Sequence, residues 1–157
     1  MSTLSLRPVS ALDDAVAKAR EAAKAALPLV GATLHAQFPD GAYLVLTRPE
    51  EYDSDEHDAV RLDSVRDADG NTLWEFDEHV LRQPQLPAVP DEIAALWGDL
   101  DPRDPAAVLE LVQRIDAIAP YELLDFLPVE VCTVEETKAE ELGERSLLGI
   151  PLAPAAD

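Results

Sequence analysis

Cysteine, aromatic residues and long apolar runs are scarce in this 157-residue sequence. Its one cysteine, Cys132, cannot form an internal disulfide, which favours a reducing compartment such as the cytoplasm. No run of 18 apolar residues occurs, and the first residues lack the apolar core of a secretion signal, so we expect no membrane span and no export. With only 5% aromatic residues, the core is expected to consist mostly of Leu, Val, Ile and Ala.

Positive charge is scarce as well. Three Lys stand beside nine Arg and abundant Ala, a bias typical of GC-rich bacterial genomes. Residues 1–48 hold four acids and five bases, a net of +1, whereas residues 49–157 hold 28 acids and seven bases, a net of −21. Nucleic acids and anionic membranes bind basic surfaces, so we exclude both as partners. A basic protein partner, a cation or simple solubility remains as the reason for the charge.

The amounts of apolar and charged residues, 47% and 28%, are typical of a folded globular protein. We therefore expect residues 1–157 to form a single acidic α+β domain. Its expected parts are an N-terminal kinked helix, a three-stranded antiparallel meander, and then a C-terminal group of helices.

The helix is predicted near the start of the chain. Ser10 and Asp13 have the spacing of a capping box. Apolar residues then recur every three or four positions from Leu12 to Phe38, which predicts one helical face packed on one surface. Pro28 falls inside this run, and its ring predicts a kink or a short break.

A strand over residues 42–48 is followed by an acidic stretch, PEEYDSDEHD, with six acids in ten residues. This density predicts an exposed loop, and its acids Asp55 and Glu56 join the candidate interaction surface.

The segment VRLDSVRDADGNTLWEFDEH, residues 60–79, predicts a hairpin. A three-residue loop ending in Gly70 pairs Asp67 with Asn71 and places Val60, Leu62 and Ser64 on one face with Trp74 and Phe76. This register groups the apolar residues better than a two-residue loop does. The other face then carries Arg61, Asp63, Val65, Leu73, Glu75, Asp77 and His79.

In this register Asp63 lies directly opposite Glu75, an unfavourable like-charge pair. Local rules are often broken at functional sites, so the partner-binding surface is predicted to hold Asp63, Glu75, Asp77 and His79. A solvated sheet face is the plain structural interpretation of the same charges. A metal site is a further alternative, with the ligand set His57, Asp63, Glu75, Asp77 and His79.

Helices are predicted from Asp91 to Gly98 and from Asp104, where Asp104 is an N-cap followed by Pro105. One or two helical turns are expected in YELLDFL, and a short fourth strand over residues 129–134. Thr133 and Glu136 have capping-box spacing. A loose tail is expected from about residue 146, docked by Leu147, Leu148 and Ile150.

The sequence contains no phosphate-binding loop, dinucleotide fingerprint, nucleophile elbow or zinc-protease motif, so we predict no catalytic residue and no cofactor. Cys132 lies in an apolar run and is interpreted as a core residue. We expect a non-enzymatic protein-interaction module, an acidic adaptor or inhibitor that binds a basic protein surface. The alternatives are a metal-binding or metal-dependent enzyme that uses the acidic and histidine face of the hairpin, and a DNA-mimic inhibitor of a nucleic-acid-binding protein.

Overall fold

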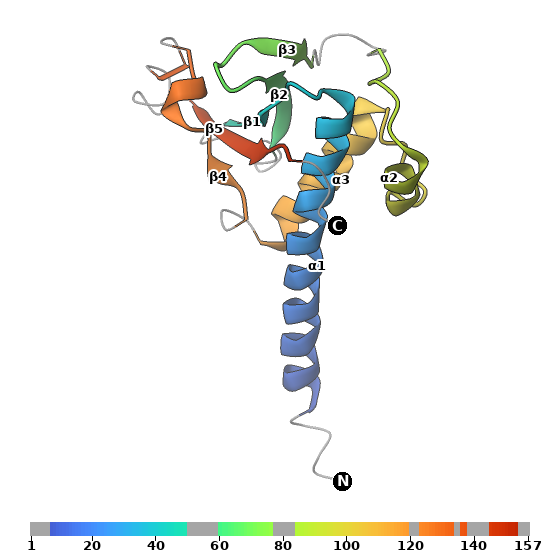
Figure 1. The fold of residues 1–157 in the computed structure, drawn as a ribbon. Coiled ribbons are helices and arrows are strands. Elements are labelled where there is room, and N and C mark those ends of the chain that lie inside the picture. The colour runs from blue at the N-terminus through green and yellow to red at the C-terminus, as the bar shows by residue number, and fades with distance from the viewer. Residues whose placement is uncertain are drawn as a thin grey trace.

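The computed structural model describes residues 7–49, 60–76, 84–119, 123–133, 136–137 and 145–153. These residues form an α+β fold, as predicted, in which helices pack on one face of an antiparallel sheet (Figure 1). In chain order the elements are α1 (Arg7–Gln37), β1 (Tyr43–Pro49), β2 (Arg61–Arg66), β3 (Thr72–Glu75), α2 (Asp91–Leu96), α3 (Pro105–Ile118), β4 (Asp125–Phe126), the 3₁₀ helix η2 (Val129–Val131) and β5 (Arg145–Pro151).

The sheet has five strands in the order β3-β2-β1-β5-β4, and all four neighbouring pairs are antiparallel. The predicted meander of β1, β2 and β3 is confirmed. The sheet is nevertheless larger than predicted, because β5 pairs along the whole of β1 and β4 pairs with β5.

The predicted loose tail from about residue 146 is wrong as far as Pro151, because residues 145–151 form an interior strand of the sheet. Leu147, Leu148 and Ile150 are buried, so the predicted docking through these three side chains is confirmed. Helix α1 crosses closely over the end of this strand: a Cβ atom added to Gly31 would lie 2.6 Å from the carbonyl oxygen of Pro151. Only glycine permits such an approach of helix to strand.

The predicted start of α1 is wrong, because the helix starts at Arg7 rather than at Ser10. The helix runs through Pro28 as one element of 31 residues, so the proline does not break it. Pro28 is exposed, whereas Ala23, Val30 and Leu34 on either side of it are buried in the core. Packing on both sides of the proline holds the helix together despite the backbone hydrogen bond that proline cannot donate.

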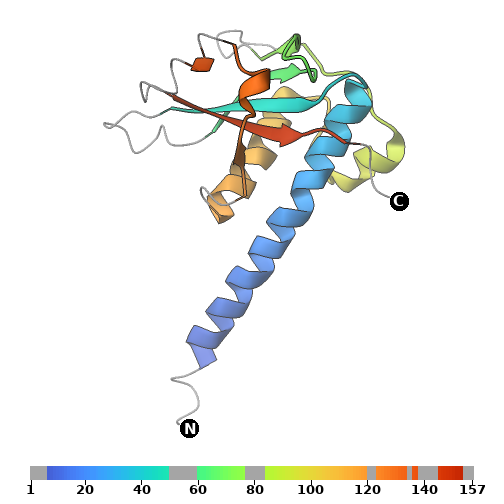
Figure 2. The ribbon, with the colours of Figure 1, turned by 60° about the vertical axis from the view of Figure 1, so that its left-hand side comes forward.

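The first half of α1 projects away from the rest of the molecule (Figures 1 and 2). Val9, Leu12 and Val16 are 63%, 64% and 49% exposed. The expectation that the whole apolar face of α1 packs on one surface is therefore wrong for its first half.

The larger core lies between the sheet and the helices and contains Leu44, Leu46, Leu148 and Ile150 from the strands, with Val108 and Ile115 from α3. A smaller core of Val45, Leu127, Val131 and Leu147 covers the opposite sheet face. The predicted cap of α3 is confirmed, because the Asp104 carboxylate accepts a hydrogen bond from the amide of Ala106 at 3.0 Å.

The segment between α3 and β5 differs from prediction. Asp125–Phe126 forms β4 where helical turns were expected, and Val129–Val131 forms η2 where a strand was expected. The amide of Val131 donates to the carbonyl of Pro128 at 3.0 Å, so the chain turns directly after Pro128. Cys132 is half-buried and packs against the smaller core. No described helix is long and apolar enough to cross a membrane.

Candidate functional site

The predicted interaction surface lies only partly within the described structure. Asp63 belongs to β2 and Glu75 to β3. The other members, and the additional candidate metal ligand, lie outside the described residues: Asp55, Glu56, His57, Asp77 and His79.

The hairpin turn forms as predicted. The amide of Asp67 donates to the carbonyl of Asn71 at 3.0 Å, and Gly70 has a φ of +88°. The Asp67 carboxylate accepts hydrogen bonds from the amides of Asn71 and Asp69, at 2.9 and 3.0 Å. These bonds, led by the one from Asn71, lower the pKa of Asp67 and fix the turn.

Beyond the turn, the predicted pairing of Asp63 with Glu75 is wrong. The observed partners are Ser64 with Glu75, Val65 with Trp74 and Arg66 with Thr72, so Leu73 is an extra residue in β3. This bulge shifts the register by one residue and separates the two carboxylates along the strands.

A second bulge, at Asp63, changes which side chains of β2 face the helices. Leu46 of β1 pairs with Leu62, and Val45 pairs with Ser64, so Asp63 is the extra residue in β2. Because of this bulge, both Leu62 and Val65 face the main core, and Val65 is fully buried. The predictions that Ser64 faces the core and that Val65 faces solvent are therefore wrong.

On the sheet face opposite the helices, β2 carries a buried ion pair where an exposed acidic face was predicted. The guanidinium of Arg66 donates from Nη1 to Oε1 of Glu136 at 2.7 Å and from Nη2 to Oε2 at 2.6 Å. Arg66 is 5% exposed and Glu136 6% exposed. Nη2 also lies 3.3 Å from Oδ2 of Asp63, and Nε donates to the Ser64 hydroxyl at 3.1 Å. Asp63 is thus a partner of Arg66 rather than an unpaired surface acid.

Glu136 is held by its backbone neighbours as well. The amide of Thr133 donates to Oε1 of Glu136 at 2.8 Å, and the amide of Glu136 donates to the Thr133 hydroxyl at 3.1 Å, which confirms the predicted capping box. Burial alone would raise the pKa of Glu136, but the hydrogen bonds from Arg66 and Thr133 outweigh it and lower the pKa to about 2.

The cluster of Asp63, Arg66 and Glu136 has a structural role. Both carboxylate oxygens of Glu136 are occupied by Arg66, and Nη1 of Arg66 also donates to the carbonyl of Val131 at 3.2 Å. These contacts tie Val131 and Glu136 to β2. Among the residues with assigned positions, no group of three or more His, Cys, Asp or Glu side chains is placed to hold a metal ion.

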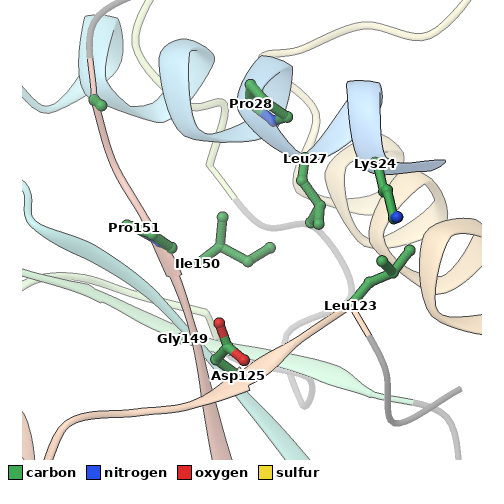
Figure 3. A pocket seen from close by; sticks show the side chains of 9 residues that line it. Lys24, Leu27, Pro28, Leu123, Asp125, Gly149, Ile150 and Pro151 are labelled. Carbon is green, nitrogen blue, oxygen red and sulfur yellow. The ribbon is translucent and has the colours of Figure 1, made fainter. Parts of the chain in front are cut away.

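A pocket of about 430 Å³ opens between α1 and the β4–β5 edge (Figure 3). Lys24, Leu27 and Pro28 of α1 line one side, and Asp125 and Ile150 line the other. Most of its lining is apolar, with one ammonium and one carboxylate group, and its volume is within the range of small-molecule sites.

An acidic surface also covers α2. Ile93 and Trp97 turn inward, and the Trp97 indole donates to the Thr33 hydroxyl of α1 at 2.8 Å. The opposite side carries Leu96, which is 69% exposed. We call it the α2 surface, and it consists of the exposed residues Asp91, Glu92, Leu96, Asp99 and Asp101.

Only one basic residue, Arg103, lies between residues 91 and 104. The Nε atom of Arg103 donates to the carbonyl of Leu86 at 2.9 Å. This nitrogen is therefore bound to the backbone and not to a carboxylate of the α2 surface. The α2 surface therefore combines one exposed apolar side chain with four exposed acids.

Comparison with known proteins gave no match to a family model, a curated protein or a solved structure.

Sequence reasoning missed the α2 surface although its pattern is readable. Within α2, Asp91 and Ala95, and likewise Glu92 and Leu96, are four residues apart, and this spacing places them away from Ile93, whereas Asp99 and Asp101 follow the end of the helix. The Arg66–Glu136 pair had one sequence indication, the Thr133–Glu136 capping box, but nothing local indicates that Arg66 lies beside it.

Proposed function

We propose that the protein is a non-enzymatic interaction module that binds a basic protein surface, and that the α2 surface makes the central contact. The observation that carries this proposal is the exposed Leu96 in a segment whose four acids, Asp91, Glu92, Asp99 and Asp101, are exposed as well. An apolar anchor within a charged rim is the usual arrangement of a protein–protein interface.

Electrostatics supports the same partner class. Residues 49–157 carry a net charge of −21, so a basic protein is attracted over a long range and oriented before contact. Glu136, whose pKa is lowered to about 2, forms a buried ion pair with Arg66 and does not face a partner. The acids on the α2 surface are exposed and able to meet a partner.

The test is capture from a lysate of the source organism at low salt, followed by elution with a salt gradient and mass spectrometry. The wild-type chain is compared with an α2 variant carrying Asp91→Asn, Glu92→Gln, Asp99→Asn and Asp101→Asn. A matched control carries Asp13→Asn, Asp14→Asn, Glu21→Gln and Asp40→Asn, which are also exposed acids and remove the same charge.

The proposal predicts a basic protein that binds to the wild type and to the matched control but not to the α2 variant. Leu96→Ala should also weaken capture, by about tenfold or more if Leu96 is a hot spot. Equal loss in both charge variants would show non-specific attraction to net charge and contradict a contact through α2.

A further inference from the structure

Small and apolar residues recur at regular spacing along one face of α1, and this face is exposed in the first half of the helix. Val9, Leu12, Val16, Ala19, Ala23, Ala26 and Val30 alternate at spacings of three and four residues, the a/d pattern of a coiled coil. Ala23 and Val30 are buried in the chain's own core, whereas Val9, Leu12 and Val16 are not covered by any described part of the chain. The stripe therefore continues past the body of the protein onto the projecting part of the helix. Figure 2 shows this part of α1 extending away from the sheet and the other helices.

The charge of the projecting helix indicates which kind of partner covers this stripe. Residues 7–19, the projecting part of α1, hold two acids and two bases, so the projecting helix is neutral. Residues 25–157 hold 29 acids and eight bases, a net of −21. A basic partner is attracted to the body and gains little from the neutral helix, whereas a second copy offers the same neutral, heptad-patterned stripe.

The charge of residues 25–157, which form the body of the protein, favours one direction of pairing. A parallel pair would place two bodies of charge −21 side by side, whereas an antiparallel pair places them at opposite ends of the joined helices. The bare stripe ends near Ala19, where the body begins to cover α1, so overlap is confined to residues 9–19. Leu12 of one copy then lies beside Val16 of the other, and Val9 beside Ala19.

We propose that the projecting half of α1 is a self-association surface, and that two copies pair antiparallel through Val9, Leu12 and Val16. Ala15, which is exposed on one flank of the stripe, allows the two helices to approach closely. Asp13 lies near the two-fold axis of this pair, close to its own symmetry mate. Salt screens both this repulsion and that between the bodies, so the dimer tightens as salt rises. Binding of a basic protein has the opposite salt dependence, so the two proposals fail independently.

Sedimentation equilibrium of the full chain tests the surface. From about 5 to about 200 µM, a range that spans micromolar dissociation constants, the wild type should shift from monomer to dimer. Leu12→Glu and Val16→Glu should remain monomeric with unchanged circular dichroism, and Asp13→Asn should tighten the dimer. Leu96→Glu, at the exposed position on α2, should dimerise like the wild type. A wild type that stays monomeric throughout, or a Leu12→Glu chain that still dimerises, would overturn the proposal.

Disulfide trapping tests the direction. In a Cys132→Ser background, a chain with Leu12→Cys is mixed with one carrying Val16→Cys under mild oxidation. Antiparallel pairing predicts the mixed disulfide as the main product. Predominant disulfides between identical chains would indicate parallel pairing and overturn the antiparallel arrangement.

Discussion

The guanidinium of Arg66 and the carboxylate of Glu136 form a two-pronged ion pair, with N–O distances of 2.7 and 2.6 Å, between residues 70 positions apart. The pair joins β2, within the central meander, to the segment that precedes β5. Since both groups are almost fully buried, Glu136 depends on Arg66 for its charge to be compensated, and Arg66 depends mainly on Glu136, with Asp63 as a more distant second partner at 3.3 Å.

Removing the charge of Glu136 should destabilise the protein strongly. Glu136→Gln leaves the buried Arg66 with only its longer ion pair to Asp63, at 3.3 Å, and is expected to lower the free energy of unfolding by about 3 kcal/mol. Urea denaturation measures this change. The control is Glu110→Gln, which breaks the exposed pair with Arg114 and should cost less than about 0.5 kcal/mol. Similar losses in the two variants would contradict a buried pair.

The same carboxyl group predicts how stability depends on pH. The pKa of Glu136 is lowered from 4.5 to about 2 in the folded protein, so between these values the unfolded chain binds more protons than the folded one. This contribution is complete above about pH 5 and is lost as the pH falls toward about 2, and it amounts to at most about 3 kcal/mol. The difference in unfolding free energy between the wild type and Glu136→Gln should therefore shrink over this interval. A difference independent of pH would be inconsistent with the lowered pKa.

The hairpin turn depends on glycine at position 70. Gly70 has a φ of +88°, and a Cβ atom there would lie 2.9 Å from the carbonyl oxygen of Val131. Gly98 also has a positive φ, of +65°, but a Cβ atom there would meet nothing within 4 Å. Gly98→Ala is thus expected to cost about 1 kcal/mol from backbone strain, and Gly70→Ala about 2 kcal/mol or more. Thermal unfolding compares the two, and equal costs would mean that the contact with Val131 is absent.

Strand β5 should contribute to the stability of the whole sheet. Leu147 is fully buried between β1 and β4, so Leu147→Ala is expected to lower the free energy of unfolding by about 2–4 kcal/mol. The comparison is Leu73→Ala, since Leu73 is 38% exposed in the β3 bulge. This substitution should lower the free energy of unfolding by about 1 kcal/mol or less. If Leu147→Ala were as mild as Leu73→Ala, β5 would behave as a docked tail rather than as an interior strand.

Elements with strong local patterns were predictable from the sequence. The cap at Asp104, the turn that ends at Gly70 and the capping box at Thr133 all formed as expected, because each depends on residues within four positions of one another. The hairpin register beyond the turn was not predictable. Bulges at Asp63 and Leu73 are responses to packing on β1 and on the helices, and they leave no local mark in the sequence.

The placement of β5 shows the same limit. The segment LLGIPL has no strict alternation, since Leu147 and Leu148 are buried on opposite faces of the sheet in the two different cores. A strand covered on both faces resembles any short apolar segment, so its pairing with β1 across about 100 residues depends on tertiary contacts. The candidate site shares this dependence, because no local pattern indicates that Arg66 pairs with Asp63 and Glu136.

The most direct test of the proposed function is the salt dependence of the dissociation constant between the chain and the protein it captures, measured by calorimetry. For the wild type and for the matched control, affinity is expected to fall by about tenfold or more between about 50 and 300 mM salt. The α2 variant should bind more weakly at every salt concentration and with a shallower dependence. An affinity that is unchanged by salt, or equal in the wild type and the α2 variant, would contradict binding of a basic surface through α2.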